Sequence, residues 1–197
     1  MCQTTFQVED HPVARILRLQ SEDGTNRLTR ACVNSLVDAI TSLSKEKRAL
    51  VITGNNRFFS SGAELEEITV LTSAPAYEFS KMGQALMTMI NCFPAAVYAA
   101  ISGYCMGGGL DLALACQRRI ATQNAVFGHR GAALGLITGW GGTQRLPRLI
   151  GKGRALELFV EAEKIGATRA LSIGLIDAIA SDPVAETLRQ IQTVTVR

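Results

Sequence analysis

The feature that most constrains the fold is an alternation of strand-like and helix-like apolar patterns along the chain. Residues 13–20 (VARILRLQ) alternate apolar and polar side chains as a half-buried strand does, and residues 49–54 (ALVITG) form a short apolar run that ends in glycine. Between them, apolar residues recur at three- and four-residue steps over residues 29–44, which predicts an amphipathic helix. This order indicates an α/β protein.

The same alternation continues through the second half of the chain. A second helical stripe runs over residues 82–93 and stops at Pro94, which cannot continue a helix. Asp182 and Pro183 predict the cap and first turn of a final helix that extends to about residue 192. The other expected elements are a strand at 95–101, a tight glycine loop at 103–109, a short buried helix at 110–116, a strand at 119–122, helices at 142–150 and 154–161, and a strand at 176–180.

Length and composition predict one domain. The chain has 197 residues, of which 47% are hydrophobic and 19% charged, and this is sufficient for one substantial core. No internal repeat, low-complexity segment or linker divides it. We therefore expect a single domain over residues 1–197, with a core of about residues 1–180 and one terminal helix at about 183–192.

Charge and cysteine usage exclude several classes of protein. The 20 Lys and Arg residues against 17 Asp and Glu give a net charge of +3 without a basic run, which argues against nucleic-acid binding. The apolar stretches end well before the roughly 18 residues of a membrane-spanning helix, and the first residues do not resemble a secretory signal, so we expect a cytoplasmic protein. The cysteines form no CxxC pair, so we expect no metal site and mostly buried, reduced thiols at Cys2, Cys32, Cys92, Cys105 and Cys116.

Two glycine-rich loops each lie between a predicted strand and a predicted helix, at residues 58–65 (FFSSGAEL) and 103–111 (GYCMGGGLD). Backbone N–H groups at the start of a helix have no partner within it, so they suit an anion or a developing oxyanion. The missing Cβ atoms of Gly107, Gly108 and Gly109 would allow a substrate to approach the main chain. Tight turns against a packed helix explain the same glycines equally well.

Common nucleotide and hydrolase signatures are missing. The 103–109 loop does not have the GxGxxG spacing, and residues 151–153 (GKG) lack the rest of a phosphate-binding loop. No GxSxG occurs, and the only histidines are His11 and His129. Nucleotide hydrolysis and serine hydrolase chemistry are therefore not supported.

The two loops, together with residues 127–129 (FGH) and 139–147 (GWGGTQRLP) in this order and spacing, resemble the enoyl-CoA hydratase/isomerase (crotonase) family. The resemblance extends from the first strand to about residue 180, and four separate motifs agree. It implies an α/β fold in which ββα units wind in a spiral. It also implies an acyl-CoA thioester as the partner, with coenzyme A as part of the substrate and no metal or other cofactor.

The resemblance also implies a set of site residues. The thioester oxygen would accept hydrogen bonds from the N–H groups of Ala63 and Gly108, which are candidate catalytic residues together with Asp111. Preorganised donors of this kind each supply roughly 3–4 kcal/mol when negative charge develops on that oxygen. Trp140 would either shorten the acyl pocket or pack in the core. The full substrate-binding set implied is Ser61, Gly62, Ala63, Leu65, Gly107, Gly108, His129, Gly131 and Trp140.

The carboxylates are where the sequence departs from the family pattern. A hydratase of this family uses two glutamates, one after the triple glycine and one shortly after the Phe-Gly pair. Asp111 stands at the first position, and its alternative role is to stabilise the helix dipole by roughly 0.3–1 kcal/mol. Gly131 stands at the second, which argues against a two-carboxylate hydratase and also against the family's single-carboxylate isomerases, which usually keep their acid there. The naphthoate-synthase branch also has glycine at that position, but it has an acid near Thr138, so it matches poorly too. His129 and Arg130 could supply a base or an anion contact near Gly131, or His129 could be structural or face solvent.

We therefore expect an enzyme that stabilises the enolate of an acyl-CoA, namely an enoyl-CoA hydratase/isomerase, a lyase or isomerase of fatty acid metabolism. Decarboxylation or thioester hydrolysis in the same site is an alternative. A non-catalytic acyl-CoA-binding subunit is a rival from a different class.

The C-terminal helical part is shorter than the family norm, because only one helix follows the strand near residue 176. We therefore expect a more open acyl pocket. Members of this family form trimers and dimers of trimers, so the resemblance predicts a homotrimer or a dimer of trimers. The contacts would come from the apolar residues Leu146, Leu149, Ile150, Leu156, Phe159 and Val160.

Overall fold

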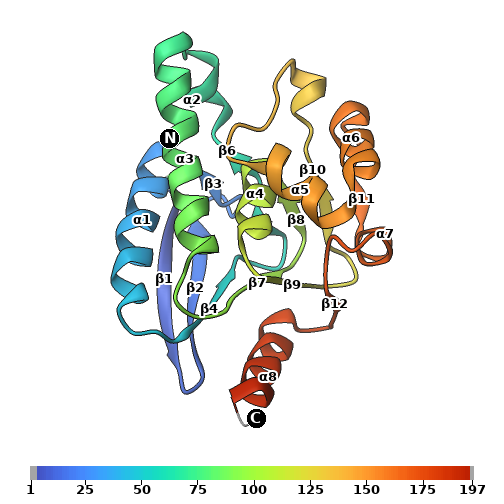
Figure 1. Ribbon diagram of the computed structural model, residues 1–197. Coiled ribbons are helices and arrows are strands. Elements are labelled where there is room, and N and C mark those ends of the chain that lie inside the picture. Colours follow the sequence, from blue (N-terminus) through green and yellow to red (C-terminus); the bar gives the residue numbers. More distant parts are fainter. Residues whose placement is uncertain (1–3, 196–197) are drawn as a thin grey trace.

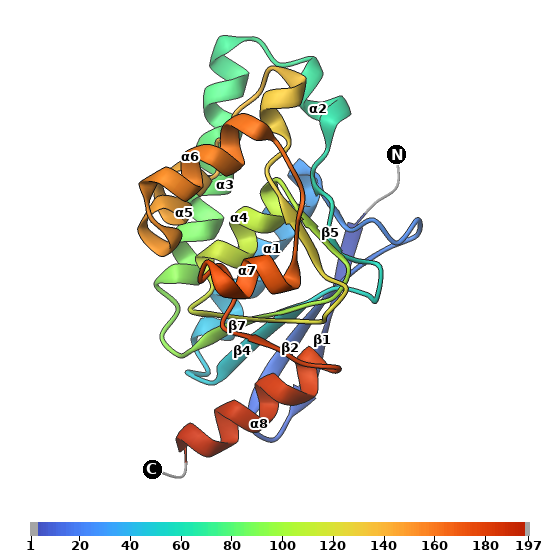
Figure 2. The ribbon, with the colours of Figure 1, turned by 90° about the vertical axis from the view of Figure 1, so that its right-hand side faces the viewer.

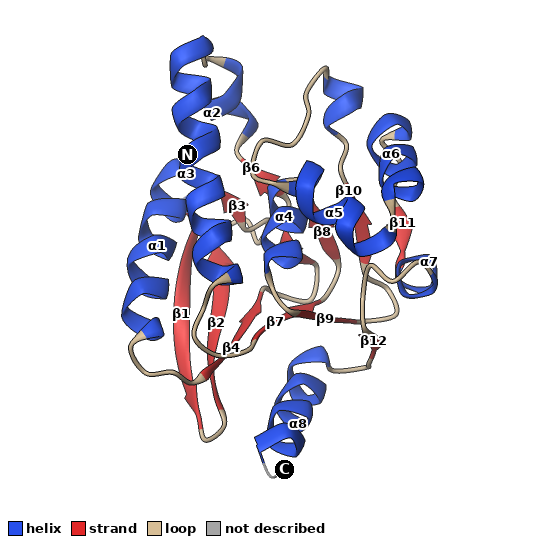
Figure 3. Ribbon diagram, viewed as in Figure 1, coloured by secondary structure: helices blue, strands red, loops and turns tan. Residues whose placement is uncertain are grey.

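The structure is a computed structural model that describes residues 4–195 (Figure 3). Cys2 and the predicted limits of the domain at residues 1 and 197 lie outside the described residues. In chain order the elements are β1 (Thr4–His11), β2 (Ala14–Ser21), β3 (Arg27–Leu28), α1 (Arg30–Ser44), β4 (Ala49–Thr53), β5 (Phe58–Ser60), β6 (Gly62–Ala63), α2 (Leu65–Thr69), α3 (Ser73–Asn91), β7 (Val97–Ile101), β8 (Tyr104–Met106), α4 (Gly108–Ala115), β9 (Arg118–Ala121), β10 (Val126–Gly128), the 3-10 helix η1 (Gly131–Leu134), α5 (Gly142–Ile150), α6 (Lys152–Glu161), β11 (Ile165–Gly166), α7 (Ala167–Ser172), β12 (Ala178–Ile179) and α8 (Pro183–Thr195).

The larger sheet has the strand order β1-β2-β4-β7-β9-β12, and all its neighbours are parallel except the β1–β2 hairpin. Alternate side chains of its central strands point to opposite faces, and both faces are buried. Leu50 and Ile52 of β4 pack into the main core on the face that most of the helices cover. Val51 points to the opposite face and packs in the smaller core cluster with α8. Figure 2 shows α8 below the sheet and the other helices above it.

A second, smaller sheet with the order β11-β10-β8-β5 lies beside the first, and β3 pairs with β6. The chain therefore repeats one pattern: a strand of the large sheet, one or more short strands outside it, and then a helix (Figure 1). Three successive repeats run β2–β3–α1, β4–β5–β6–α2 and β7–β8–α4. The α/β spiral of ββα units that the resemblance implies is confirmed.

Several element boundaries differ from the sequence prediction. The expected glycine loop at 103–109 contains a strand, β8, because residues 104–106 pair in parallel with both β5 and β10. The strand predicted from residue 95 begins at Val97, and β1 was not predicted. Residues 13–20 also form a strand that is covered on both faces rather than a half-buried one.

Side chains cap two of the helices, and the cap predicted at Asp182 is one of them. The Thr29 side chain caps α1 by accepting a hydrogen bond from the Cys32 N–H at 3.1 Å. The Asp182 carboxylate caps α8 by accepting from the N–H groups of Val184 and Ala185, each at 3.0 Å. Among the helices of residues 4–195, none combines the length and the apolar content needed to span a membrane.

Candidate active site

A cavity of about 770 Å³ lies at the N-terminal end of α4, bordered by the ends of β6, β8 and β10, by α2 and α3, and by η1 and the segment after it. All the site residues predicted from sequence line it except Gly62, which is not among the lining residues. The lining residues from that prediction are Ser61, Ala63, Leu65, Gly107, Gly108, Asp111, His129, Gly131 and Trp140.

The backbone around Gly62 and Gly108 brings two N–H groups together. Gly62 has a φ of +99°, and a Cβ atom there would lie 2.7 Å from the Met106 carbonyl oxygen and 3.0 Å from the Gly108 nitrogen. A Cβ on Gly108 would in turn lie 3.2 Å from the Ala63 nitrogen. Since Gly108 is in the first turn of α4, its N–H has no partner within the helix. The nitrogens of Ala63 and Gly108 are thus neighbours at the cavity wall.

The three consecutive glycines have separate structural reasons. Gly107 has a φ of +51°, and its N–H donates to the Gly128 carbonyl of β10 at 2.9 Å. A Cβ on Gly108 would lie 2.6 Å from the Trp140 ring, and one on Gly109 would lie 2.7 Å from Ser60 Cβ. These contacts confirm the tight-packing explanation for Gly108 and Gly109, and the close approach of a substrate to this loop stays a prediction.

Asp111 lies in the first turn of α4 with only 1% of its surface exposed. Burial raises the pKa of its carboxyl group to about 7, against the opposing effects of the hydrogen bond from Thr138, of the Arg145 charge and of the nearby Gly142 backbone. The Thr138 hydroxyl donates to Oδ2. A merely solvated acid at a helix start would not be buried in this way.

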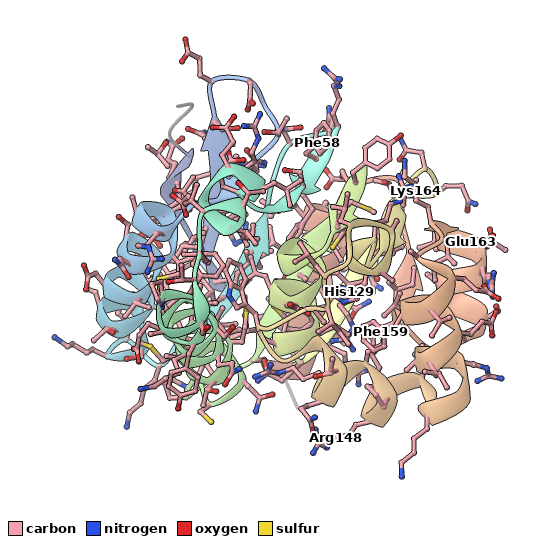
Figure 4. The ribbon with its side chains drawn as sticks, turned by 90° about the horizontal axis from the view of Figure 1, so that it is seen from above. Phe58, His129, Arg148, Phe159, Glu163 and Lys164 are labelled. Atoms are coloured by element: carbon pink, nitrogen blue, oxygen red, sulfur yellow. The ribbon has the colours of Figure 1, made fainter. Side chains whose placement is uncertain are left out.

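His129 does not face solvent, which corrects one of the alternatives left open by the sequence. It directly follows β10, is 4% exposed, and its ring lies 5.3 Å from that of Phe159 of α6 (Figure 4). Burial lowers the pKa of its imidazole to about 4, so the ring is neutral at physiological pH. Its Nε2 atom lies 3.4 Å from Oδ1 of Asp111.

At Gly131, where the family has its second glutamate, backbone atoms of the following segment lie where a side chain would begin. Gly131 is the first residue of η1, and its carbonyl accepts a hydrogen bond from the Leu136 N–H at 2.8 Å. A Cβ on Gly131 would lie 2.6 Å from the Leu136 carbonyl oxygen. Arg130 also lines the cavity and is exposed.

Trp140 forms part of the cavity wall and of the core at the same time. It is 3% exposed, its Nε1 donates to the Phe79 carbonyl at 3.2 Å, and the two rings are 5.3 Å apart. A Cβ on Gly83 of α3 would overlap the indole, so this glycine makes room for it. The two readings of Trp140 offered by the sequence are therefore not exclusive.

Two of the three glutamates in residues 64–67 have structural partners. Glu64 precedes α2 and accepts a hydrogen bond from Arg27 at 2.9 Å, which lowers the pKa of its carboxyl group. Glu67 accepts from the Arg30 N–H at the start of α1 at 2.8 Å. Within the described part of the chain, no three Cys, His, Asp or Glu side chains are grouped as metal ligands would be.

Two residues that sequence reasoning did not assign lie against Asp111 in the candidate site. Thr138 contacts Asp111, and its only signal was its place at a position where a related branch has an acid. Gly142 lies against both Asp111 and His129, and a Cβ there would overlap Oδ1 and lie 3.1 Å from Nε2. Since these residues come from distant segments, only the folded chain brings them together.

Comparison with known proteins agrees with this architecture. The family model described as enoyl-CoA hydratase/isomerase matches residues 10–195. The chain belongs to this family. A solved structure of enoyl-CoA hydratase from Bacillus anthracis matches 98% of this chain and 77% of its own with a TM-score of 0.91 and 31% identity.

Curated relatives are longer than this chain. Crotonyl-CoA hydratase of Syntrophomonas wolfei is 36% identical over 167 residues, which cover 83% of this chain and 64% of that protein. A probable enoyl-CoA hydratase of Bacillus subtilis is 44% identical over 136 residues, which cover 68% of this chain and 53% of the relative. The match thus spans between about half and two thirds of these relatives.

Proposed function

We propose that the protein binds an acyl-CoA thioester and stabilises its enolate, acting as an enoyl-CoA hydratase/isomerase. The observation that carries this proposal is the juxtaposition of the Ala63 and Gly108 nitrogens in a cavity that also contains a buried carboxyl group, Asp111. Coenzyme A enters as part of the substrate, and no metal or redox cofactor is part of the proposal.

The proposed chemistry uses the two halves of the site together. The N–H groups of Ala63 and Gly108 would donate to the thioester oxygen as negative charge develops on it, each contributing roughly 3 kcal/mol to the transition state. Asp111 would exchange a proton with the carbon chain. Because its pKa is raised to about 7, it can both accept and donate a proton near neutral pH.

The lining of the cavity supports a thioester ligand. Apolar side chains on α2, α3 and the 136–140 segment, such as Ile68 and Ile137, suit an acyl chain. Two exposed basic residues, Arg130 and Lys164, also line it and suit the phosphates of coenzyme A. The Lys164 ammonium lies 5.2 Å from the centre of the Tyr104 ring.

Among the described residues that line the cavity, Asp111 is the only acidic one. One acid suffices to move a double bond, because the same group removes a proton at one carbon and returns it at another. This observation also favours, as a second candidate, decarboxylation or hydrolysis of a thioester in the same site. A site that binds thioesters without converting them is the remaining alternative.

A panel of thioesters tests the proposal. Enoyl-, malonyl- and 3-hydroxyacyl-CoA would be incubated with the protein and followed by mass spectrometry, and double-bond migration would be followed by NMR. We expect a gain of water or a shift of the double bond with an enoyl-CoA. Loss of carbon dioxide or release of free CoA would support the second candidate, and binding without conversion would contradict catalysis.

We further propose that the protein forms a threefold-symmetric oligomer. Leu146 and Ile150 pack within the chain, but Leu156 and Val160 of α6 are 63% and 67% exposed and provide apolar surface for a neighbouring subunit. Sedimentation equilibrium at micromolar concentration should give about three times the 21.1 kDa chain mass. A single species at the chain mass would contradict the trimer. A cytoplasmic location and a role in fatty acid metabolism stay predictions.

A further inference from the structure

Two buried polar atoms in the site face each other without a hydrogen-bond partner. Oδ1 of Asp111 and Nε2 of His129 are fully buried, and neither forms a hydrogen bond with any described residue. They lie 3.4 Å apart. A buried polar group without a partner costs about 1–3 kcal/mol, so two such groups at this distance call for a reason.

Several elements hold these two side chains against each other. The Thr138 hydroxyl donates to Oδ2 of Asp111, which leaves Oδ1 toward the imidazole. Phe159 packs beside the imidazole ring (Figure 4). Gly142 lies so close that any side chain there would displace the pair. Residues from α4, α5 and α6 and the residue that follows β10 therefore hold this contact in place.

We propose that His129 is the proton-sharing partner of Asp111, so that the two side chains hold one proton between Oδ1 and Nε2 and act as a single acid–base unit. The inference rests on the proposed function, and it assigns to His129 the role left open by Gly131, whose position has no carboxylate. Contacts of this kind are often long in the unliganded state and shorten when substrate binds.

The proton balance of hydration is satisfied by such a unit. A water oxygen forms a bond to Cβ of the enoyl group, the carbon–carbon π electrons move toward the thioester oxygen, and a water proton passes to the pair. The proton that the pair held passes to Cα as the enolate electrons form the new C–H bond. The pair ends with one proton, as it began, and no oxidant or reductant is required.

Few other charges act on the pair. Arg145 of α5 and the Cys105 thiol of β8 interact electrostatically with Asp111, and Arg130 follows His129 along the chain. Burial raises the pKa of Cys105, so the thiol stays protonated. Only the pair itself therefore titrates between the values of about 4 for His129 and about 7 for Asp111, as one coupled unit.

NMR titration of the imidazole tests the inference without relying on turnover. The chain has only two histidines, and a His11→Gln variant leaves the signals of His129 alone. We expect the imidazole 15N shifts of His129 to change near pH 7, when Asp111 ionises, and to show ring protonation only near pH 4. In Asp111→Asn the step near pH 7 should vanish. A single titration near pH 6.5, unchanged in Asp111→Asn, would overturn the inference.

Turnover provides an independent readout once the thioester panel has identified a substrate. The Gln amide of His129→Gln can donate a hydrogen bond but cannot carry a proton, so we expect kcat to fall about 10²-fold with KM within a few-fold. The wild-type pH profile should fall below about pH 4 and above about pH 7, and the acid limb should be lost in the variant. An unchanged kcat and profile would refute the role of His129, whereas an inactive wild type with the expected NMR steps would refute the proposed function alone.

Discussion

The two halves of the candidate site are built in different ways. The donor half, formed by Ala63 and Gly108, consists of backbone atoms that are fixed by strand pairing, by the positive φ of Gly62 and by the start of α4. The acid–base half consists of the Asp111 and His129 side chains, which burial and packing hold together. One half depends on where the main chain runs, and the other on which side chains converge.

This difference determines how each half responds to substitution. A change of side chain at Ala63 leaves the backbone N–H in place, so the donor half tolerates substitutions other than proline. In the acid–base half, we expect a change of a single atom type, as in Asp111→Asn, to remove the proposed proton transfer.

The largest effect is expected from removing one backbone donor. Ala63→Pro lacks the N–H and should lower turnover about 10²- to 10³-fold, whereas Ala63→Ser keeps the N–H and should retain most of it. Steady-state kinetics on the substrate found in the thioester panel would measure both. Equal activity of two well-folded variants would remove Ala63 from the site.

Asp111→Asn should remove proton transfer and, at high pH, stabilise the protein. Because the pKa of Asp111 is raised to about 7 in the folded state, the free energy of unfolding of the wild type falls as pH rises from near 4 to 7. Above pH 7 this loss of stability is complete. At about 1.4 kcal/mol per pKa unit, the gain in the free energy of unfolding is up to about 4 kcal/mol at pH 8 and less than half of that at pH 5. Urea unfolding at both pH values would check this, and a variant no more stable at pH 8 than at pH 5, relative to wild type, would contradict the burial argument.

Much of the donor half could be predicted from sequence, because it depends on local patterns. The glycines at 62 and 107–109 indicate the two strand-to-helix turns at which Ala63 and Gly108 lie, and the alternation of strand-like and helix-like apolar patterns indicates the α/β class. The strand β8 was missed because three residues are too few to show a period, and only pairing with β5 and β10 makes them a strand.

The acid–base half could be predicted only in part. Asp111 was predicted as a candidate from its place after the glycines, but its contact with His129 was not predicted, since the two are separated by 18 positions and lie on different elements. Thr138 and Gly142 have no local signal for contact with Asp111. Tertiary packing, which no single segment encodes, sets this part of the site.

A smaller loss is expected from crowding the acid–base half. Gly142→Ala would place a methyl group against Asp111 and His129, and we expect about 2–3 kcal/mol of destabilisation with loss of turnover. Gly153→Ala is the matched control, because nothing lies within 4 Å of a Cβ there and the helix α6 should gain about 0.5–1 kcal/mol. Thermal unfolding of both variants would test the contrast, and equal stabilities would refute it.

Restoring the missing glutamate should not restore a two-carboxylate site. In Gly131→Glu the new Cβ would lie 2.6 Å from the Leu136 carbonyl oxygen, which is main chain, so we expect about 1–3 kcal/mol of destabilisation and no rise in hydration. The obstacle is this contact rather than a positive φ, since Gly131 is not among the described residues with positive φ. A stable variant with faster hydration would show that the 131–136 segment can move aside.

Exchange of α-protons with solvent tests the central claim most directly, because it reports enolate formation whatever the net reaction is. Butanoyl-CoA would be incubated in D2O with the protein, and deuterium at Cα would be followed by NMR. We predict exchange with the wild type, a loss of at least about 10²-fold in both Ala63→Pro and Asp111→Asn, and near-normal exchange in Ala63→Ser. Binding of butanoyl-CoA without any exchange by the wild type, or undiminished exchange in Asp111→Asn, would contradict the account.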